Sequence, residues 1–135
     1  MANTFYPKGA EKMLSGAINY NADTIKVAIV SDGYTYSAAH EFLSDAGTLV
    51  GAAQTLGNKT VTGGVFDAAD ADFGAIAPGS TAKAAILYKD TGNASTSPLM
   101  AYIDQLTGFP FTTNGGGVSI PWSNGAGKIF SLIPA

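Results

Sequence analysis

His40 is the only histidine of the chain and its first candidate for acid–base chemistry. A helix over this segment would place His40 and Ser44 on one face, with Glu41 next to the histidine. Nucleophilic catalysis needs a nucleophile, a base and a group that orients the base, and the sequence contains no G-x-S-x-G motif. We therefore interpret His40 as a structural or solvated residue, and we predict no catalytic residue and no enzymatic activity.

Asp67, Asp70 and Asp72 form a local acidic cluster in the segment DAADAD. Calcium prefers several carboxylate oxygens as ligands, but this spacing does not match the EF-hand loop. On a strand, only Asp70 and Asp72 would lie on the same side. The pattern favours a polar entry into a strand and we predict no metal site, although the sequence alone leaves metal binding by the three aspartates open.

The glycine-rich residues 125–128 (GAGK) have the composition of a phosphate-binding loop. The Walker pattern requires glycine where Trp122 stands and serine or threonine where Ile129 stands. Phosphate loops also open a helix, whereas this segment leads into a predicted strand. These departures exclude a nucleotide-binding loop here, and we predict no cofactor.

Tyrosines are numerous, and Tyr34, Tyr36 and Trp122 are candidates for stacking on a sugar or a base. Tyr88 and Tyr102 fall in predicted core strands, and packing in a core or an interface is the favoured interpretation of the aromatic residues. An exposed aromatic cluster that binds carbohydrate is the alternative.

The composition narrows the function classes. Hydrophobic residues make up 46% of the 135 residues and charged residues 13%, with a net charge of −3; typical domains carry about 25% charged residues. All seven basic residues are lysines, which argues against nucleic-acid binding because arginine is the usual reader of guanine and clamp of phosphate. Cysteine is absent, so disulfides and thiolate metal sites are excluded.

The hydropathy pattern contains no apolar run of the ~20 residues that a membrane-spanning helix needs. The N-terminal residues also lack the apolar stretch of a secretory signal. We expect a soluble protein made in the cytoplasm, without a membrane partner.

Turn residues recur along the chain and separate short apolar runs, a pattern typical of a β-sandwich or barrel. Glycines at 63 and 64 are expected to bulge or break one run, runs 82–88 and 98–103 have the apolar character of central strands, and Val118, Ile120 and Trp122 are expected to share a face. The predicted strands cover residues 24–30, 48–53, 59–66, 71–76, 82–88, 98–103, 118–122 and 128–133.

Two segments have helical spacing. Residues 8–18 place Met13, Leu14 and Ile18 on one side, and Pro7 is well suited to begin the helix. Residues 37–46 are a second candidate, with Ser37 as the N-cap. We therefore predict a mainly β, single domain over residues 1–135, a β-sandwich or barrel-like fold of about eight short strands with one or two short helices, in which residues 1–7 form an N-terminal arm.

Several residue strings, in their order and spacing, are similar to a widespread family of small structural proteins of tailed bacteriophages, over residues 5–132. The strings are YPK at 6–8 with Glu11, Lys12 and Leu14; TIKVAIV at 24–30; HEFLSD at 40–45; KTVT at 59–62; FDAAD at 66–70; ILYKDTG at 86–92; SPL at 97–99; YID at 102–104; NGG at 114–116; Trp122; and GKIF at 127–130.

This resemblance implies a component of the virion without catalytic residues. The small size and the lack of a long coiled-coil or fibrous segment favour a capsid decoration (cement) protein. Such a protein would lie on the outer surface of the head, bind the major capsid protein and bridge shell subunits. We expect a homo-oligomer, with a trimer as the working assumption, assembled through sheet edges and apolar faces. The alternatives are a tail, head-fibre or head–tail connector component, or a surface carbohydrate-binding module.

Overall fold

The structure is a computed structural model that describes residues 4–104, 106, 108–120, 122 and 129–131. Strands dominate it, which confirms the predicted mainly β fold. The elements are β1 (Thr4–Phe5), α1 (Pro7–Leu14), β2 (Ile25–Ser31), a 3-10 turn (Leu43–Ala46), β3 (Leu49–Thr55), a second 3-10 turn (Thr62–Gly64), β4 (Val65–Phe66), β5 (Ala71–Ala75), β6 (Thr81–Lys89), β7 (Leu99–Ile103), β8 (Phe111–Thr112), β9 (Gly117–Ile120) and β10 (Phe130–Ser131).

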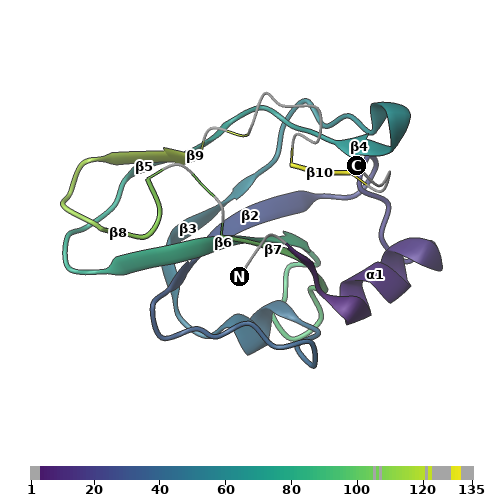
Figure 1. The fold of residues 1–135 in the computed structure, drawn as a ribbon, viewed down its shortest axis with the longest axis horizontal. Coiled ribbons are helices and arrows are strands. Elements are labelled where there is room, and N and C mark those ends of the chain that lie inside the picture. The colour runs from purple at the N-terminus through teal and green to yellow at the C-terminus, as the bar shows by residue number, and fades with distance from the viewer. Residues whose placement is uncertain (1–3, 105, 107, 121, 123–128, 132–135) are drawn as a thin grey trace.

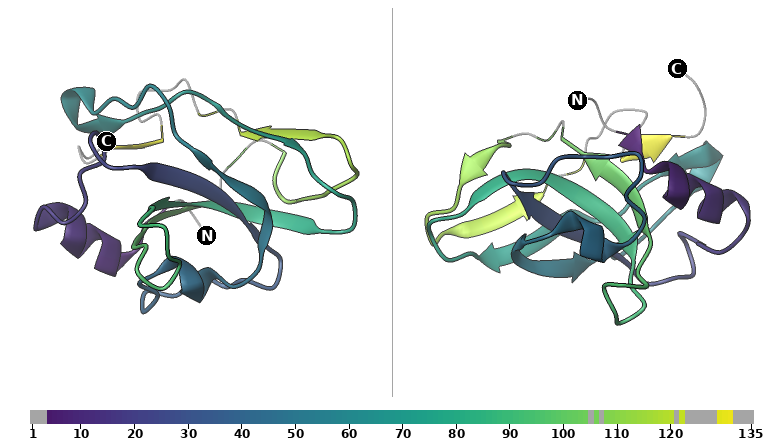
Figure 2. Two further views of the ribbon diagram at one scale, coloured as in Figure 1. Left: turned by 180° about the vertical axis from the view of Figure 1, so that it is seen from behind. Right: turned by 90° about the horizontal axis from the view of Figure 1, so that it is seen from below.

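The strands form one main antiparallel sheet and two small ones. The main sheet has the order β1-β7-β6-β2-β3, and β8 pairs with the beginning of β6. The small sheets are the antiparallel pairs β5–β9 and β4–β10. Both small sheets lie on the same side of the main sheet (Figure 1). The second views show the same layering from other directions (Figure 2).

The central strands β2, β6 and β7 of the main sheet are buried on both faces. Ile25, Val27 and Ile29 of β2 belong to a core that also includes Trp122 and Ile120 of the small-sheet side. This core is the interior of the sandwich that the alternating pattern predicts, and Leu87 and Ile103 lie in it with 0% and 2% exposure.

The opposite face of the main sheet has a core of its own. Ala28 and Val30 of β2 and Ile86 of β6 pack there against Tyr34 and Ala46, which belong to the segment between β2 and β3. We call residues 32–48 the covering loop. This loop covers the second face of β2 and β6, and the nearly continuous apolar run of β6 confirms the prediction of a central strand over residues 82–88.

Helix α1 begins at Pro7 as predicted but ends earlier than the sequence pattern suggests. The N–H of Gly16 donates to Met13 O and that of Ala17 to Lys12 O, with Gly16 at φ +86°. This is the Schellman arrangement that ends helices at glycine. The helix therefore stops before its expected last turn, and Leu14, expected on the buried side, is 86% exposed.

The predicted helix over residues 37–46 is wrong except for the short 3-10 turn at its end. The Asp45 carboxylate accepts the backbone N–H groups of Glu41 and Phe42 at 2.8 and 3.0 Å. The Leu43 N–H donates to Ser97 O in the loop between β6 and β7. Side-chain and distant acceptors thus take the backbone donors that a helix would have used.

Other differences concern short strands. Residues 4–7, expected in the N-terminal arm, form β1 and the start of α1, while β8 was not predicted. The predicted strand 59–66 breaks at its glycine pair, because Gly63 and Gly64 take positive φ values in a 3-10 turn and leave only β4. Pro121 and half of the predicted strand 128–133 (residues 128, 132 and 133) lie outside the described residues.

Gly9 allows α1 to lie directly on β7. A Cβ atom at this position would be 2.1 Å from Leu99 O, a backbone atom that cannot move independently. We expect Gly9→Ala to lower the free energy of unfolding by about 1–3 kcal/mol, the usual cost of overpacking. Gly57→Ala is the matched control: no atom lies within 4 Å of its added Cβ, and its change should stay under ~0.5 kcal/mol. Urea unfolding measures both, and equal values would contradict this packing.

Candidate functional site

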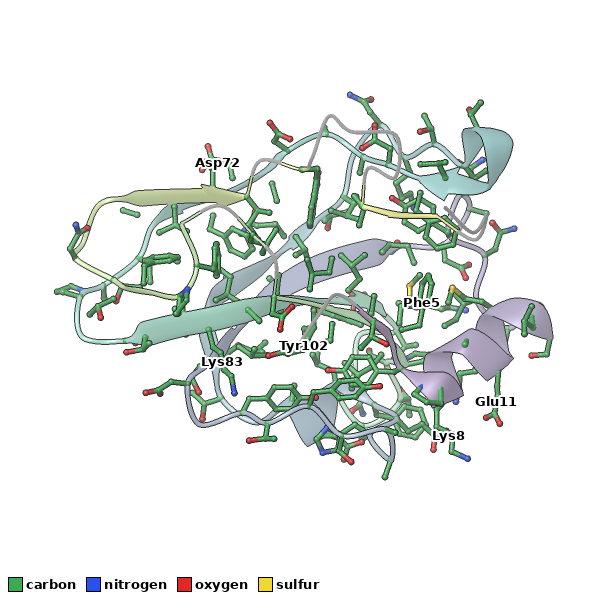
Figure 3. The ribbon with its side chains drawn as sticks, viewed as in Figure 1. Phe5, Lys8, Glu11, Asp72, Lys83 and Tyr102 are labelled. Carbon is green, nitrogen blue, oxygen red and sulfur yellow. The ribbon has the colours of Figure 1, made fainter. Side chains whose placement is uncertain are left out.

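A cluster of four tyrosines holds the covering loop on the main sheet. Tyr6 follows β1, Tyr34 and Tyr36 belong to the loop, and Tyr102 lies in β7. The ring centroids of Tyr6 and Tyr36 are 5.0 Å apart, and those of Tyr36 and Tyr102 are 5.6 Å apart. Tyr102 and Lys83 lie on the loop side of the main sheet, whereas Phe5 lies on the opposite side (Figure 3).

The cluster contains a chain of hydrogen bonds that ends at His40. The hydroxyl oxygens of Tyr6 and Tyr34 are 2.6 Å apart, and the Tyr34 hydroxyl is 2.8 Å from His40 Nδ1. Burial raises the pKa of the Tyr6 phenol above its ordinary value, and its hydrogen bond to Tyr34 raises it further. Burial also raises the pKa of Tyr34. Both phenols are therefore protonated at neutral pH, which suits a hydrogen-bonding role and disfavours a nucleophilic one.

An open cleft of about 420 Å³ lies beside this chain. Its lining includes Tyr34, His40, Asp45, Ser31 and Thr48. The structure thus places His40 next to Asp45 and Tyr34 instead of the partners expected from a helix.

The expected partners of His40 have other roles. The Glu41 carboxylate is 2.7 Å from Lys12 Nζ of α1. The Ser44 backbone N–H donates to Ala94 O, and this serine is exposed. His40, Ser44 and Glu41 are therefore not assembled as a nucleophile, a base and an orienting group.

Two further polar contacts attach the covering loop to its surroundings. Lys83 Nζ of β6 donates to Tyr34 O at 2.6 Å. The carboxylate of Asp45 has a pKa below its ordinary value because it accepts the Glu41 and Phe42 N–H groups, with a smaller contribution from the charge of His40. The polar groups around the cleft thus fix the path of the loop.

The three aspartates of the acidic cluster make hydrogen bonds to three different partners. Asp70 Oδ1 accepts the Trp122 N–H at 2.9 Å, and Asp72 Oδ1 accepts the Gly74 N–H at 2.8 Å. The backbone oxygen of Asp67 accepts the Tyr20 hydroxyl. Within the part of the chain that the structure describes, no group of three or more histidine, cysteine, aspartate or glutamate side chains is arranged to hold a metal ion.

The aromatic candidates for stacking do not form an exposed platform. Trp122 is 5% exposed and its indole N–H donates to Ala69 O, while Tyr34 is 6% exposed. Core packing is thereby confirmed for these two residues, and Tyr36 is half-buried. The glycine-rich residues 125–128 lie outside the described residues.

Sequence reasoning missed the roles of Tyr6 and of its contact with Tyr34. Tyr6 was assigned to an arm, and 28 positions separate it from Tyr34 along the chain. The available signal was Tyr102, whose position in a strongly apolar strand indicated a core that contains tyrosine. Tyr6 and Tyr34 belong to that same core.

Comparison with known proteins finds no matching family model, no curated relative and no solved structure with significant similarity. Among the described residues, no helix has the length and apolar character needed to span a membrane.

The hydrogen-bond chain predicts coupling between two tyrosines. Tyr34→Phe should destabilise the protein by about 1–3 kcal/mol, since it removes the hydrogen-bond partner of the buried Tyr6 hydroxyl, and Tyr6→Phe should cost less, about 0.5–1.5 kcal/mol, because Tyr34 keeps its bond to His40. The double variant should lose less than the sum, because the two share one bond. Tyr20→Phe, whose hydroxyl binds Asp67 O instead, is the control and should add independently to Tyr34→Phe. Urea unfolding of the unaltered protein, both single variants and the double variant gives the free energies that each double-mutant cycle needs. Additive losses for Tyr6 and Tyr34 would contradict the hydrogen bond between them.

The lowered pKa of Asp45 predicts a pH dependence of stability. A carboxyl group whose pKa is lower in the folded than in the unfolded state stabilises the fold above its unfolded pKa of ~4, and this stabilisation disappears as the pH falls through the folded value. Asp45→Asn should therefore be less stable than the unaltered protein at neutral pH. The difference should shrink at a pH well below both pKa values, as measured by urea unfolding. A constant difference across the range would refute the charge-based explanation.

Proposed function

We propose that this protein is a structural component of a tailed-phage particle, and specifically a capsid decoration protein on the outer surface of the head. The observation that carries the proposal is the ordered series of residue strings over residues 5–132 that resembles small virion proteins. The bound partner would be the major capsid protein, and oligomers of the chain, trimers in the simplest case, would bridge neighbouring shell subunits.

The distribution of charge supports an interaction role. Few residues are charged, and several of the lysines are engaged within the chain: Lys12 with Glu41, Lys26 with Asp90 and Lys89 with Asp23, at 2.7, 3.1 and 3.2 Å. The central parts of protein–protein interfaces are depleted of charged residues. A surface with few unpaired charges suits a protein whose neighbours cover much of it.

The rigidity of the covering loop supports the same role. The loop is attached through Tyr34 to Tyr6 and to β6 and through Glu41 to α1. An outer layer that is already ordered loses little conformational entropy when it binds a partner. Many identical weak contacts on a repeating shell would then add up to firm attachment.

Copy number in the particle tests the proposal. Quantitative mass spectrometry on separately purified heads and tails of the phage that encodes this chain should find hundreds of copies in the head fraction. Hundreds are expected because a decoration protein occupies repeated positions on the shell.

The other outcomes contradict the proposal in different ways. A few to a few tens of copies, or a signal in the tail fraction, would replace decoration by a connector, fibre or tail role. Absence from both fractions would remove the virion role altogether. The major capsid protein, measured in the same samples, is the internal standard.

A further inference from the structure

An apolar groove lies between the end of α1 and β4. It has a volume of about 350 Å³ and is lined by Met13, Gly16, Ile18, Asn19, Tyr20 and Phe66. We call it the α1 groove. Its wall is rigid, because the rings of Tyr20 and Phe66 stack at 4.9 Å and the Tyr20 hydroxyl donates to Asp67 O.

Leu14 directly follows Met13, one of the residues that line this groove, and its side chain is exposed to solvent. It is 86% exposed, and the only other large hydrophobic side chain exposed among the described residues is Val61, at 43%. A single exposed leucine is common on protein surfaces. Here the exposed leucine follows Met13, which lines the groove. The chain therefore presents, close together, a protruding apolar side chain and a concavity able to receive one.

Charges around these two features are complementary. Glu11 lies one turn before Leu14, is 70% exposed and points away from the domain (Figure 3), and its only ion pair among the described residues is a solvent-exposed one with Lys8 of the same helix, at 3.9 Å. On the groove side, Lys59 Nζ lies 5.9 Å from the centroid of the Tyr20 ring and donates one hydrogen bond to Asp23 O, which leaves two further N–H donors on its ammonium group. A leucine that enters the groove from another molecule would therefore bring a carboxylate towards a lysine.

We propose that the α1 groove binds Leu14 of a second copy of this chain, with Glu11 of that copy facing Lys59. Each copy both donates a leucine and offers a groove, so the contact can close into a symmetric oligomer without leaving an unused apolar site. The proposal rests on the proposed function in that it names the surface through which the copies associate, but the contact is a property of the isolated protein and is tested there.

Analytical ultracentrifugation of the purified chain over a range of concentrations gives the first test. The unaltered protein should form a dimer or trimer, and Leu14→Lys should weaken association at least tenfold. Val61→Lys is the matched control, since it also replaces an exposed apolar side chain by lysine, and it should associate as the unaltered protein does. Thermal melts of both variants check that they are folded.

A charge exchange tests the orientation of the contact. Glu11→Lys and Lys59→Glu should each weaken association, and the double variant should recover it because the attraction is restored with its signs exchanged. Recovery would not be expected if the two residues faced unrelated groups.

Cross-linking locates the bound leucine. The chain has no cysteine, so Leu14→Cys provides a single thiol for a benzophenone maleimide. In a mixture of ¹⁴N-labelled and ¹⁵N-labelled protein, irradiation should join the label to peptides that contain Tyr20 or Phe66 of the other isotope.

The outcomes are separable from those for the proposed function. A monomer at all concentrations, or oligomers that Leu14→Lys leaves intact, would overturn the groove contact even if particle heads contain hundreds of copies. Cross-links within one molecule only would overturn it as well. Conversely, an oligomer that depends on Leu14 would support the contact even if the chain were absent from phage heads.

Discussion

The structure depends on the burial of both faces of its central strands. Strand β2 sends alternate residues, such as Val27 and Ala28, into two different cores. The small sheets β5–β9 and β4–β10 cover one face, and the other face is covered by residues 32–48, which contain only one short 3-10 turn. A loop in this position has backbone groups that no regular ladder satisfies. The polar contacts of Asp45, Lys83 and Tyr34 satisfy that requirement and hold the loop against the sheet.

Tyrosine is well suited to this task because its ring fills apolar space while its hydroxyl reaches a polar partner. Tyr34 is almost completely buried, yet its hydroxyl lies within hydrogen-bonding distance of both Tyr6 and His40. The residue therefore joins the segment around Tyr6 to the covering loop and also links two parts of that loop, at Tyr34 and at His40. The one histidine of the chain is explained by this architecture, as the partner at the outer end of the chain of hydroxyls.

The predictable parts of the fold are those in which local pattern and tertiary environment agree. Residues 24–30 and 82–88 read as strands because β-branched and apolar residues follow one another there, and they became β2 and β6. The segment 37–46 has apolar residues at helical spacing, but it does not form the predicted helix. The Asp45 carboxylate and the Ser97 carbonyl accept backbone N–H groups that the helix would have used. The two-residue strand β1 exists only through its pairing with β7. The Tyr6–Tyr34–His40 contact was beyond sequence reasoning for the same reason, since distant segments create it.

Burial of both faces also limits how copies of this chain can associate. The faces of the central strands β2, β6 and β7 are covered within the chain, and the edges of the sheet are poor templates for strand addition. Edge strand β1 has two residues, while edge strand β3 has an irregular register opposite Val27 and Ile29, with Gly51 at φ +73°. Short and bulged edge strands discourage edge-to-edge pairing. The expected assembly through sheet edges and apolar faces stays a prediction, and the short and bulged edges make contacts through side chains outside the sheet, such as the proposed contact of Leu14 with the α1 groove, the easier route to association.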